Sequence, residues 1–362
     1  DPVAKLQQRI DRGELKLKFD EKFGYLPALL EELKVPASSQ MLVFSKTSLQ
    51  RHHIRPKNPR SIYYNDDAYI GYIPSAPLME LTGIDPKLGG VFYALEQKPV
   101  EKPRFVRNNQ CLECHAGAKT MGVPGHLVRS FITDEDGEVD LLSGVSLISH
   151  RTPLADRWGG WYTTGTHGGQ IHRGNLIGKE EFERQEKKPN FRGNLMDLGK
   201  FFRTDKYLQP GSDIVSLMVF EHQAHMHNFI ARINYDATTY LEQYHHVKYL
   251  KSIFQAFLKY LLFTEEAGLT SPIKGSSDFT RDFAAAGPRD SKGRSLRDLD
   301  LQTRMFKYPC SFLIYSAAFD NIPGPAKEEI YRRLHDILTG KDTSATGLGL
   351  AQPGQQAPPL TR

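Results

Sequence analysis

The chain has 362 residues, of which 39% are hydrophobic and 10% aromatic, and this composition excludes an intrinsically disordered protein. No apolar run approaches the roughly 20 residues that cross a bilayer, so no transmembrane segment is expected. The net charge of +5 comes without a dense block of Lys and Arg, which argues against nucleic-acid binding but still allows docking to an acidic redox protein.

The first half of the chain carries the patterns of one short helix and several antiparallel strands. Residues 26–33 predict the helix. Residues 61–73, rich in Tyr and Ile around a central Asn-Asp-Asp, predict a hairpin, and residues 91–95 predict another strand. Residues 126–148 give the clearest hairpin, because an Asp-Gly turn stands between two apolar runs.

The second half predicts helices joined by loops. Residues 151–178 are rich in Gly, Trp, His and Thr without a helical period, so we expect a long functional loop. A helix should begin at Asp213, which is a good N-cap, and run to about Tyr235. Further helices are expected over 246–263 and 326–338.

These elements predict an α+β fold with short antiparallel strands in the N-terminal half and a helical C-terminal half. We expect one large domain over residues 1–345, with a candidate sub-boundary near 180–212. A polar, Gly-rich surface loop is expected over 272–298, and the Gly-, Gln- and Pro-rich residues 346–362 predict a flexible tail.

Two of the three cysteines stand in the sequence Cys-Leu-Glu-Cys-His at residues 111–115. Such a C-x-x-C-H motif attaches a haem by two thioether bonds, and its His is the proximal iron ligand. Two vinyl groups on one porphyrin edge require two thiols at a short, fixed separation. We therefore predict one covalent haem c held by Cys111, Cys114 and His115, whereas Cys310 lies among apolar neighbours and predicts a buried core residue.

Other interpretations of the cysteines remain open. A thioredoxin-like redox pair would need a strand-to-helix context, a zinc site would need a second C-x-x-C, and a structural disulfide would be strained at this spacing. A rival zinc site could use His222, His225 and His227, but His227 falls on a different helix face and the H-E-x-x-H pattern is missing.

The segment Gln-Cys-Leu-Glu-Cys-His-Ala-Gly at 110–117 resembles the attachment segment of c-type cytochromes. Val-Pro-Gly-His-Leu-Val-Arg-Ser at 123–130, Arg-Trp-Gly-Gly-Trp-Tyr at 157–162, and Glu-His-Gln with Met-His-Asn within 221–228 resemble a group of large mono-haem proteins exported by environmental bacteria. This wider resemblance covers most of the chain. It implies a periplasmic or otherwise exported protein whose signal peptide has already been removed from this numbering, and it implies no particular reaction.

The second axial position of the iron separates an electron carrier from an enzyme, because a carrier fills it with Met or His and an enzyme leaves it open. On the helix after Asp213, His222 and Met226 share one face and His227 lies on another. The expected order of distal candidates is His222 and Met226, then His227, then His126 and His167.

A mono-haem carrier needs about a hundred residues, so the excess chain favours a pocket for a small-molecule substrate or ligand. The predicted role is a periplasmic mono-haem oxidoreductase, and peroxidase-like chemistry would draw its acid–base and charge-stabilising groups from His222, His167 and Arg157. Arg107 and Arg129 are the expected partners of the haem propionates. The alternatives are a low-spin electron-transfer cytochrome that docks to a redox partner, and a binder or sensor of NO or CO.

Overall fold

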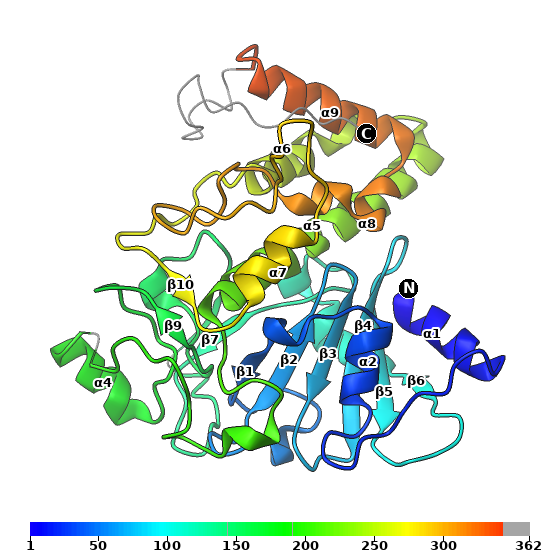
Figure 1. Ribbon diagram of the computed structural model, residues 1–362. Helices are drawn as coiled ribbons and strands as arrows, with labels where there is room; N and C mark the ends of the chain where they lie inside the picture. The colour runs from blue at the N-terminus through cyan, green and yellow to red at the C-terminus, as the bar shows by residue number, and fades with distance from the viewer. Residues whose placement is uncertain (143, 190, 343–362) are drawn as a thin grey trace.

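The computed structural model describes residues 1–142, 144–189 and 191–342, so the tail predicted over 346–362 lies outside the described residues. An antiparallel sheet occupies the N-terminal half and helices occupy the C-terminal half (Figure 1). This arrangement confirms the predicted α+β fold and differs from the small all-helical cytochrome c fold.

The main sheet has six antiparallel strands that follow chain order from edge to edge. They are β1 (Met41–Val43), β2 (Arg60–Tyr64), β3 (Ala68–Tyr72), β4 (Leu78–Asp85), β5 (Gly89–Glu96) and β6 (Phe105–Arg107). The hairpin predicted over 61–73 is confirmed as β2 and β3, and the strand predicted over 91–95 lies within β5. The β2–β3 turn is closed by Asn65, whose side chain accepts hydrogen bonds from the backbone N–H groups of Asp67 and Ala68.

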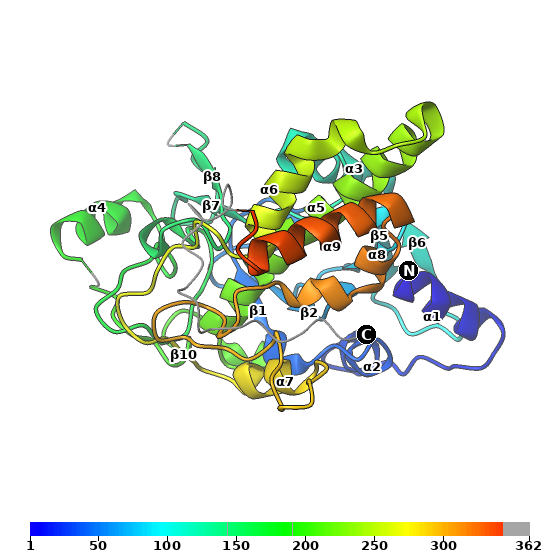
Figure 2. The same cartoon turned by 90° about the horizontal axis from the view of Figure 1, so that it is seen from above.

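Helices cover both faces of this sheet. They are α1 (Pro2–Asp11), α2 (Leu26–Glu32), α3 (Leu112–His115), α4 (Lys179–Lys187), α5 (Ile214–Tyr244), α6 (Lys251–Leu261), α7 (Phe279–Ala285), α8 (Ala317–Asp320) and α9 (Gly324–Leu338). None of these described helices is both long enough and apolar enough to cross a bilayer. In Figures 1 and 2, α6, α8 and α9 gather around α5 on one side of the sheet.

Alternate side chains of each strand face two different hydrophobic clusters. Tyr63 and Ile70 pack beneath α1 and α2, whereas Ile62, Tyr64 and Tyr69 face α5 on the other side of the sheet. The cluster around α5 also takes in residues from α6, α7 and α9. The sheet therefore separates one small apolar layer from the larger helical layer.

The central helix α5 has 31 residues and begins where the sequence predicts. Asp213 is its N-cap, and its side chain accepts hydrogen bonds from the backbone N–H groups of Val215 and Ser216. The helix ends at Tyr244 rather than near Tyr235, because no Gly or Pro interrupts it before His245 takes a left-handed conformation.

Other boundaries differ more from the predictions. The region 272–298 contains α7, because Phe279 and Phe283, one turn apart, are buried against the helical layer.

The hairpin predicted over 126–148 forms, but its strands are shorter than predicted: β7 (Arg129–Phe131) and β8 (Val145–Leu147). The segment 151–178 is mostly irregular as expected. It contributes only the two-residue strand β9 (Gly165–Thr166), which pairs with β10 (Lys274–Gly275).

Candidate cofactor site

The two motif cysteines lie close together on a single helical turn. A 3-10 turn at Asn109–Cys111 runs directly into α3, and the side chain of Asn108 caps it by accepting a hydrogen bond from the backbone N–H of Gln110. Cys111 and Cys114 are three residues apart, which places their side chains on the same side of the turn. Both thiols are free and neither is fully buried, and partial burial raises the pKa of Cys111.

His115 is oriented by its ring nitrogen Nδ1, which lies 2.8 Å from the carbonyl oxygen of Gly125. Because a carbonyl only accepts, Nδ1 carries the proton and donates it. Nε2 makes no hydrogen bond to the described residues, and burial lowers the pKa of His115, so the ring is neutral. A neutral imidazole with Nδ1–H bound to a backbone carbonyl and a free Nε2 lone pair is the usual arrangement of a metal-ligating histidine.

The carbonyl that orients His115 is held in turn by the central helix. Asn228 of α5 accepts a hydrogen bond from the backbone N–H of His126 at 2.9 Å and donates one to the backbone oxygen of His126 at 2.6 Å. A Cβ at Gly125 would collide with the side-chain oxygen of Asn228, so only glycine fits there. The chain of contacts Asn228, His126, Gly125, His115 thus ties the motif to α5.

Both motif thiols and His115 line a pocket with a volume of about 490 Å³. This lies within the range of about 300–1,000 Å³ that ligand and cofactor pockets occupy. Sheet residues form its floor, among them Ile62, Tyr69, Thr82 and Phe92, and the ring centroid of Phe92 lies 4.8 Å from that of His115. Trp161, Phe131 and Phe220 supply further aromatic walls.

Arg129, at the start of β7, contributes an unpaired positive charge to the pocket. Its guanidinium lies 5.0 Å from the ring centroid of Phe131 and forms no ion pair with the described residues. Partial burial lowers the pKa of Arg129. A half-buried guanidinium without an acidic partner favours the binding of an anion beside it.

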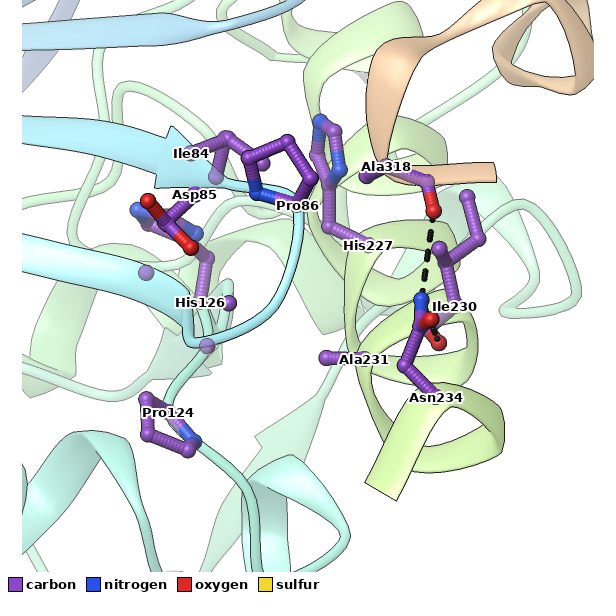
Figure 3. Close-up of a pocket in the computed structure, with 13 residues that line it drawn as sticks. Ile84, Asp85, Pro86, Pro124, His126, His227, Ile230, Ala231, Asn234 and Ala318 are labelled. Carbon is purple, nitrogen blue, oxygen red and sulfur yellow. Dashed lines mark hydrogen bonds between the residues drawn. The ribbon is translucent and has the colours of Figure 1, made fainter. Parts of the chain in front are cut away.

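His126 is buried, lines this pocket and also borders a second, much smaller cavity, which Figure 3 shows. Its ring centroid lies 4.2 Å from that of Tyr69 and 6.2 Å from that of His115, and neither ring nitrogen has a hydrogen-bond partner. The small cavity, about 10 Å³, lies between the β4–β5 turn and α5, and His227 also borders it. Its volume is close to that of one water molecule.

The three distal candidates on α5 do not line the 490 Å³ pocket. His222 is buried in the helical layer, with Nδ1 2.9 Å from Nδ1 of His150 and Nε2 2.8 Å from Oγ of Ser311. Met226 is buried in the same apolar cluster. His227 donates through Nε2 to the backbone oxygen of Asp66 at 2.9 Å. Packing rotates all three away from the motif.

The other predicted site residues also lie elsewhere. His167 is buried in the long loop, where Nδ1 donates to the backbone oxygen of Gln170 at 2.7 Å. Arg157 is buried in an ion pair with Glu221 of α5, and Arg107 is exposed on the edge strand β6. Of the predicted residues, the structure therefore brings together Cys111, Cys114, His115, His126 and Arg129.

The sequence analysis missed the polar residues that β2 and β4 contribute to the pocket. Arg60 and Glu80 line it and form an ion pair at 2.9 Å. Arg60 lies two residues before Ile62, and Glu80 lies two residues before Thr82; all four side chains face the pocket. Because side chains two apart on a strand share a face, this alternation could have predicted that Arg60 and Glu80 face the same way as their neighbours.

Among residues 1–142, 144–189 and 191–342, no group of three or more His, Cys, Asp or Glu side chains is placed to hold a metal ion. The zinc interpretations of the motif and of the α5 histidines thus lack a ligand set. A haem makes a smaller demand, because its porphyrin supplies four nitrogens and the protein supplies only axial ligands. No protein-family model, curated protein or solved structure matches this chain.

Proposed function

We propose that this chain is an exported mono-haem c redox protein in which Cys111 and Cys114 bind the haem covalently and His115 ligates the iron. The observation that carries the proposal is the orientation of His115: Nδ1 is fixed on Gly125, and Nε2 is free beside a pocket that both thiols line. The pocket volume and the unpaired Arg129 fit the same group, since a haem brings carboxylates that need cationic partners.

The bound haem would supply the one-electron chemistry, and the chain's own residues hold it. Gly125 keeps His115 in the Nδ1–H tautomer, and Asn228 keeps Gly125 in place. Arg129 is the better candidate for a propionate, because Arg107 does not line the pocket. The aromatic side chains would shield part of the group from water.

The proposal must also say whether a side chain of the protein would occupy the sixth coordination position of the iron. Among the described residues that line the pocket none is Met, and the histidines besides His115 are His52 and His126. The chain segment that holds His115 through the Gly125 carbonyl also carries His126, so His126 would lie on the same side of a bound haem as His115. We propose that the sixth position is open to a small molecule and that the protein is an oxidoreductase. The exposed His52 is the candidate sixth ligand of the alternative, an electron-transfer cytochrome.

The first experiment is to produce the chain in a periplasm with haem c maturation and to record its ferric and reduced absorption spectra. The proposal expects a Soret band and a high-spin spectrum that shifts with CO. A low-spin spectrum with sharp reduced bands would favour the carrier, and His52→Ala should then make it high-spin. The absence of a Soret band would remove the haem proposal altogether.

Covalent attachment can be tested on the cysteines one at a time. We expect Cys111→Ser and Cys114→Ser each to keep at most one thioether bond, and the double variant to lose its haem on denaturing gels stained for haem. Cys310→Ala is the matched control, because Cys310 is buried in the apolar cluster far from the motif. Equal staining of the double variant and the parent chain would contradict the attachment.

Asn228→Ala should weaken iron ligation without removing the covalent haem. Loss of the Asn228 clamp frees Gly125, so its hydrogen bond to His115 weakens and the imidazole becomes a poorer donor to ferric iron. We expect a higher reduction potential and roughly 10- to 100-fold weaker ligation by His115. Asn234→Ala is the control on the same helix, because Asn234 bonds Ile230 and Ala318 instead (Figure 3). A redox titration in which the two variants behave alike would contradict this role.

A further inference from the structure

An ion pair between Arg60 and Glu80 lies on the sheet face that lines the pocket. It sits over Gly71, which has no side chain. Nη1 of Arg60 on β2 lies 2.9 Å from Oε2 of Glu80 on β4, across the intervening strand β3. At the crossing point stands Gly71, which pairs with Ile62 on one side and Glu80 on the other. A Cβ on Gly71 would lie 2.9 Å from Nε of Arg60 and 3.2 Å from its Cζ, so the guanidinium would have to shift to make room for it. The guanidinium therefore occupies the space that a side chain at residue 71 would fill.

The ion pair with Glu80 holds the guanidinium of Arg60 in place but leaves some of its N–H groups without a hydrogen-bond acceptor. Glu80 is held from its other side by Gln50, whose side-chain nitrogen donates to Oε1 of Glu80 at 3.3 Å and to the backbone oxygen of Leu78 at 3.0 Å. Nε of Arg60 is buried and has no hydrogen-bond partner. A guanidinium offers five N–H donors, so one carboxylate does not satisfy it.

The charges around the pocket favour a ligand with a single negative charge. Arg51, Arg60 and Arg129 line it together with Glu80 and Glu113. Glu80 is paired to Arg60, whereas Arg129 has no acidic partner among the described residues. These three arginines and two glutamates leave one positive charge, which a monoanion would neutralise. A planar anion would also match the planar guanidinium of Arg60.

We propose that Arg60, positioned by Glu80 and by the space above Gly71, is an anion-binding residue of the pocket that takes a carboxylate or a small planar oxyanion. The inference rests on the proposed function for its context, since the same pocket would hold the haem. Two sources share this chemistry: a carboxylate of the bound haem itself, and a free monoanion such as formate or nitrite.

The test is calorimetric titration of the purified holoprotein with sodium formate and with sodium nitrite. For a free anion we expect saturable binding that Arg60→Gln and Gly71→Ala each weaken roughly tenfold or more, the loss of a charge-assisted hydrogen bond. Arg60→Lys keeps the charge without the fork and should fall between these variants and the parent chain. Arg107→Gln removes the same charge from an exposed position on β6 outside the pocket and should change binding less than twofold.

If the anion is a carboxylate of the haem, the parent chain will not bind free formate. Arg60→Gln and Gly71→Ala will then shift the reduction potential in the same direction, and Arg107→Gln will not. The inference is overturned if neither formate nor nitrite binds and both variants keep the parent potential. Haem staining and the Soret band are measured on every variant, so loss of the haem is distinguished from loss of the anion site.

Discussion

Lowering the pH from 6.5 to 5 is expected to remove several kcal/mol from the free energy of unfolding, a large part of the roughly 5–15 kcal/mol that stabilises a typical domain. The cause is a set of histidines buried in the folded chain. Burial lowers the pKa of His172 to about 3 and the pKa values of His225 and His227 to about 4. Burial also lowers the pKa values of His150 and His222 well below the ordinary value.

The sign follows from where the protons bind. Below about pH 6.5 these five histidines are protonated in the unfolded chain but neutral in the folded one, so the unfolded state takes up more protons. Their stabilisation is present above pH 6.5 and is lost as the pH falls. Each histidine that stays neutral in the folded chain loses at most about 1.4 kcal/mol per pH unit, which gives several kcal/mol for the set over this window.

Glu221 acts in the opposite direction and offsets a small part of this loss. Burial raises the pKa of Glu221 to about 7, although Arg157 and Trp158 act to lower it. Its contribution to stability therefore rises, by about 2 kcal/mol, as the pH falls over the same window. The net loss in the free energy of unfolding remains large because five histidines oppose the single Glu221.

Urea unfolding at pH 7, 6.5, 6, 5.5 and 5 measures this effect directly. His172→Gln should reduce the pH slope by about 1.4 kcal/mol per pH unit below pH 6, since one proton-binding difference disappears. His53→Gln is the control, because His53 is exposed on a surface turn and should leave the slope unchanged. A free energy of unfolding that stays constant from pH 7 to 5.5 would refute the argument.

Arg157→Ala is expected to cost about 3–5 kcal/mol of stability, because it leaves a carboxylate buried without its counter-charge. The side chain of Arg157 is 2% exposed, and that of its partner Glu221 is not exposed at all. Arg157 also donates to the backbone oxygens of Thr152 at 2.7 Å and His150 at 3.0 Å, which fastens the long loop to α5. Its loss should therefore loosen the loop as well as unpair Glu221.

Chemical unfolding of two further variants separates these causes. Arg157→Ala combined with Glu221→Gln removes the unpaired charge and should recover part of the lost stability. Arg173→Ala breaks an ion pair to Asp156 in the same loop, but that pair is partly exposed and should cost no more than about 1 kcal/mol. Equal losses from Arg157→Ala and Arg173→Ala would show that burial of the pair is unimportant.

The position of Arg157 also bears on its expected chemical role. The sequence analysis named it as a catalytic candidate with His222 and His167, but all three lie in hydrogen-bonded networks outside the motif pocket. Their residue types suit catalysis and equally suit a buried polar network. In the pocket itself the paired charges are Arg60 and Glu80 instead of these residues.

Local signals were sufficient for most of the secondary structure. The β2–β3 hairpin and the start of α5 depend on neighbouring residues, because a turn is closed by Asn65 and a helix is capped by Asp213. The helix α7 was missed, since its two buried phenylalanines stand in an otherwise polar segment. There the energy of burial against the helical layer outweighs the local pattern.

Local sequence alone brings Cys111, Cys114 and His115 together, because they lie on adjoining short helical turns and need no distant partner to come close. The rest of the pocket depends on how distant segments pack. The rotation of α5 depends on packing against the sheet and α6, so no periodicity within the helix reveals that His222 faces Ser311. The pairing of Arg60 with Glu80 likewise requires three strands in register, and register is set by turns and cross-strand packing rather than by either residue.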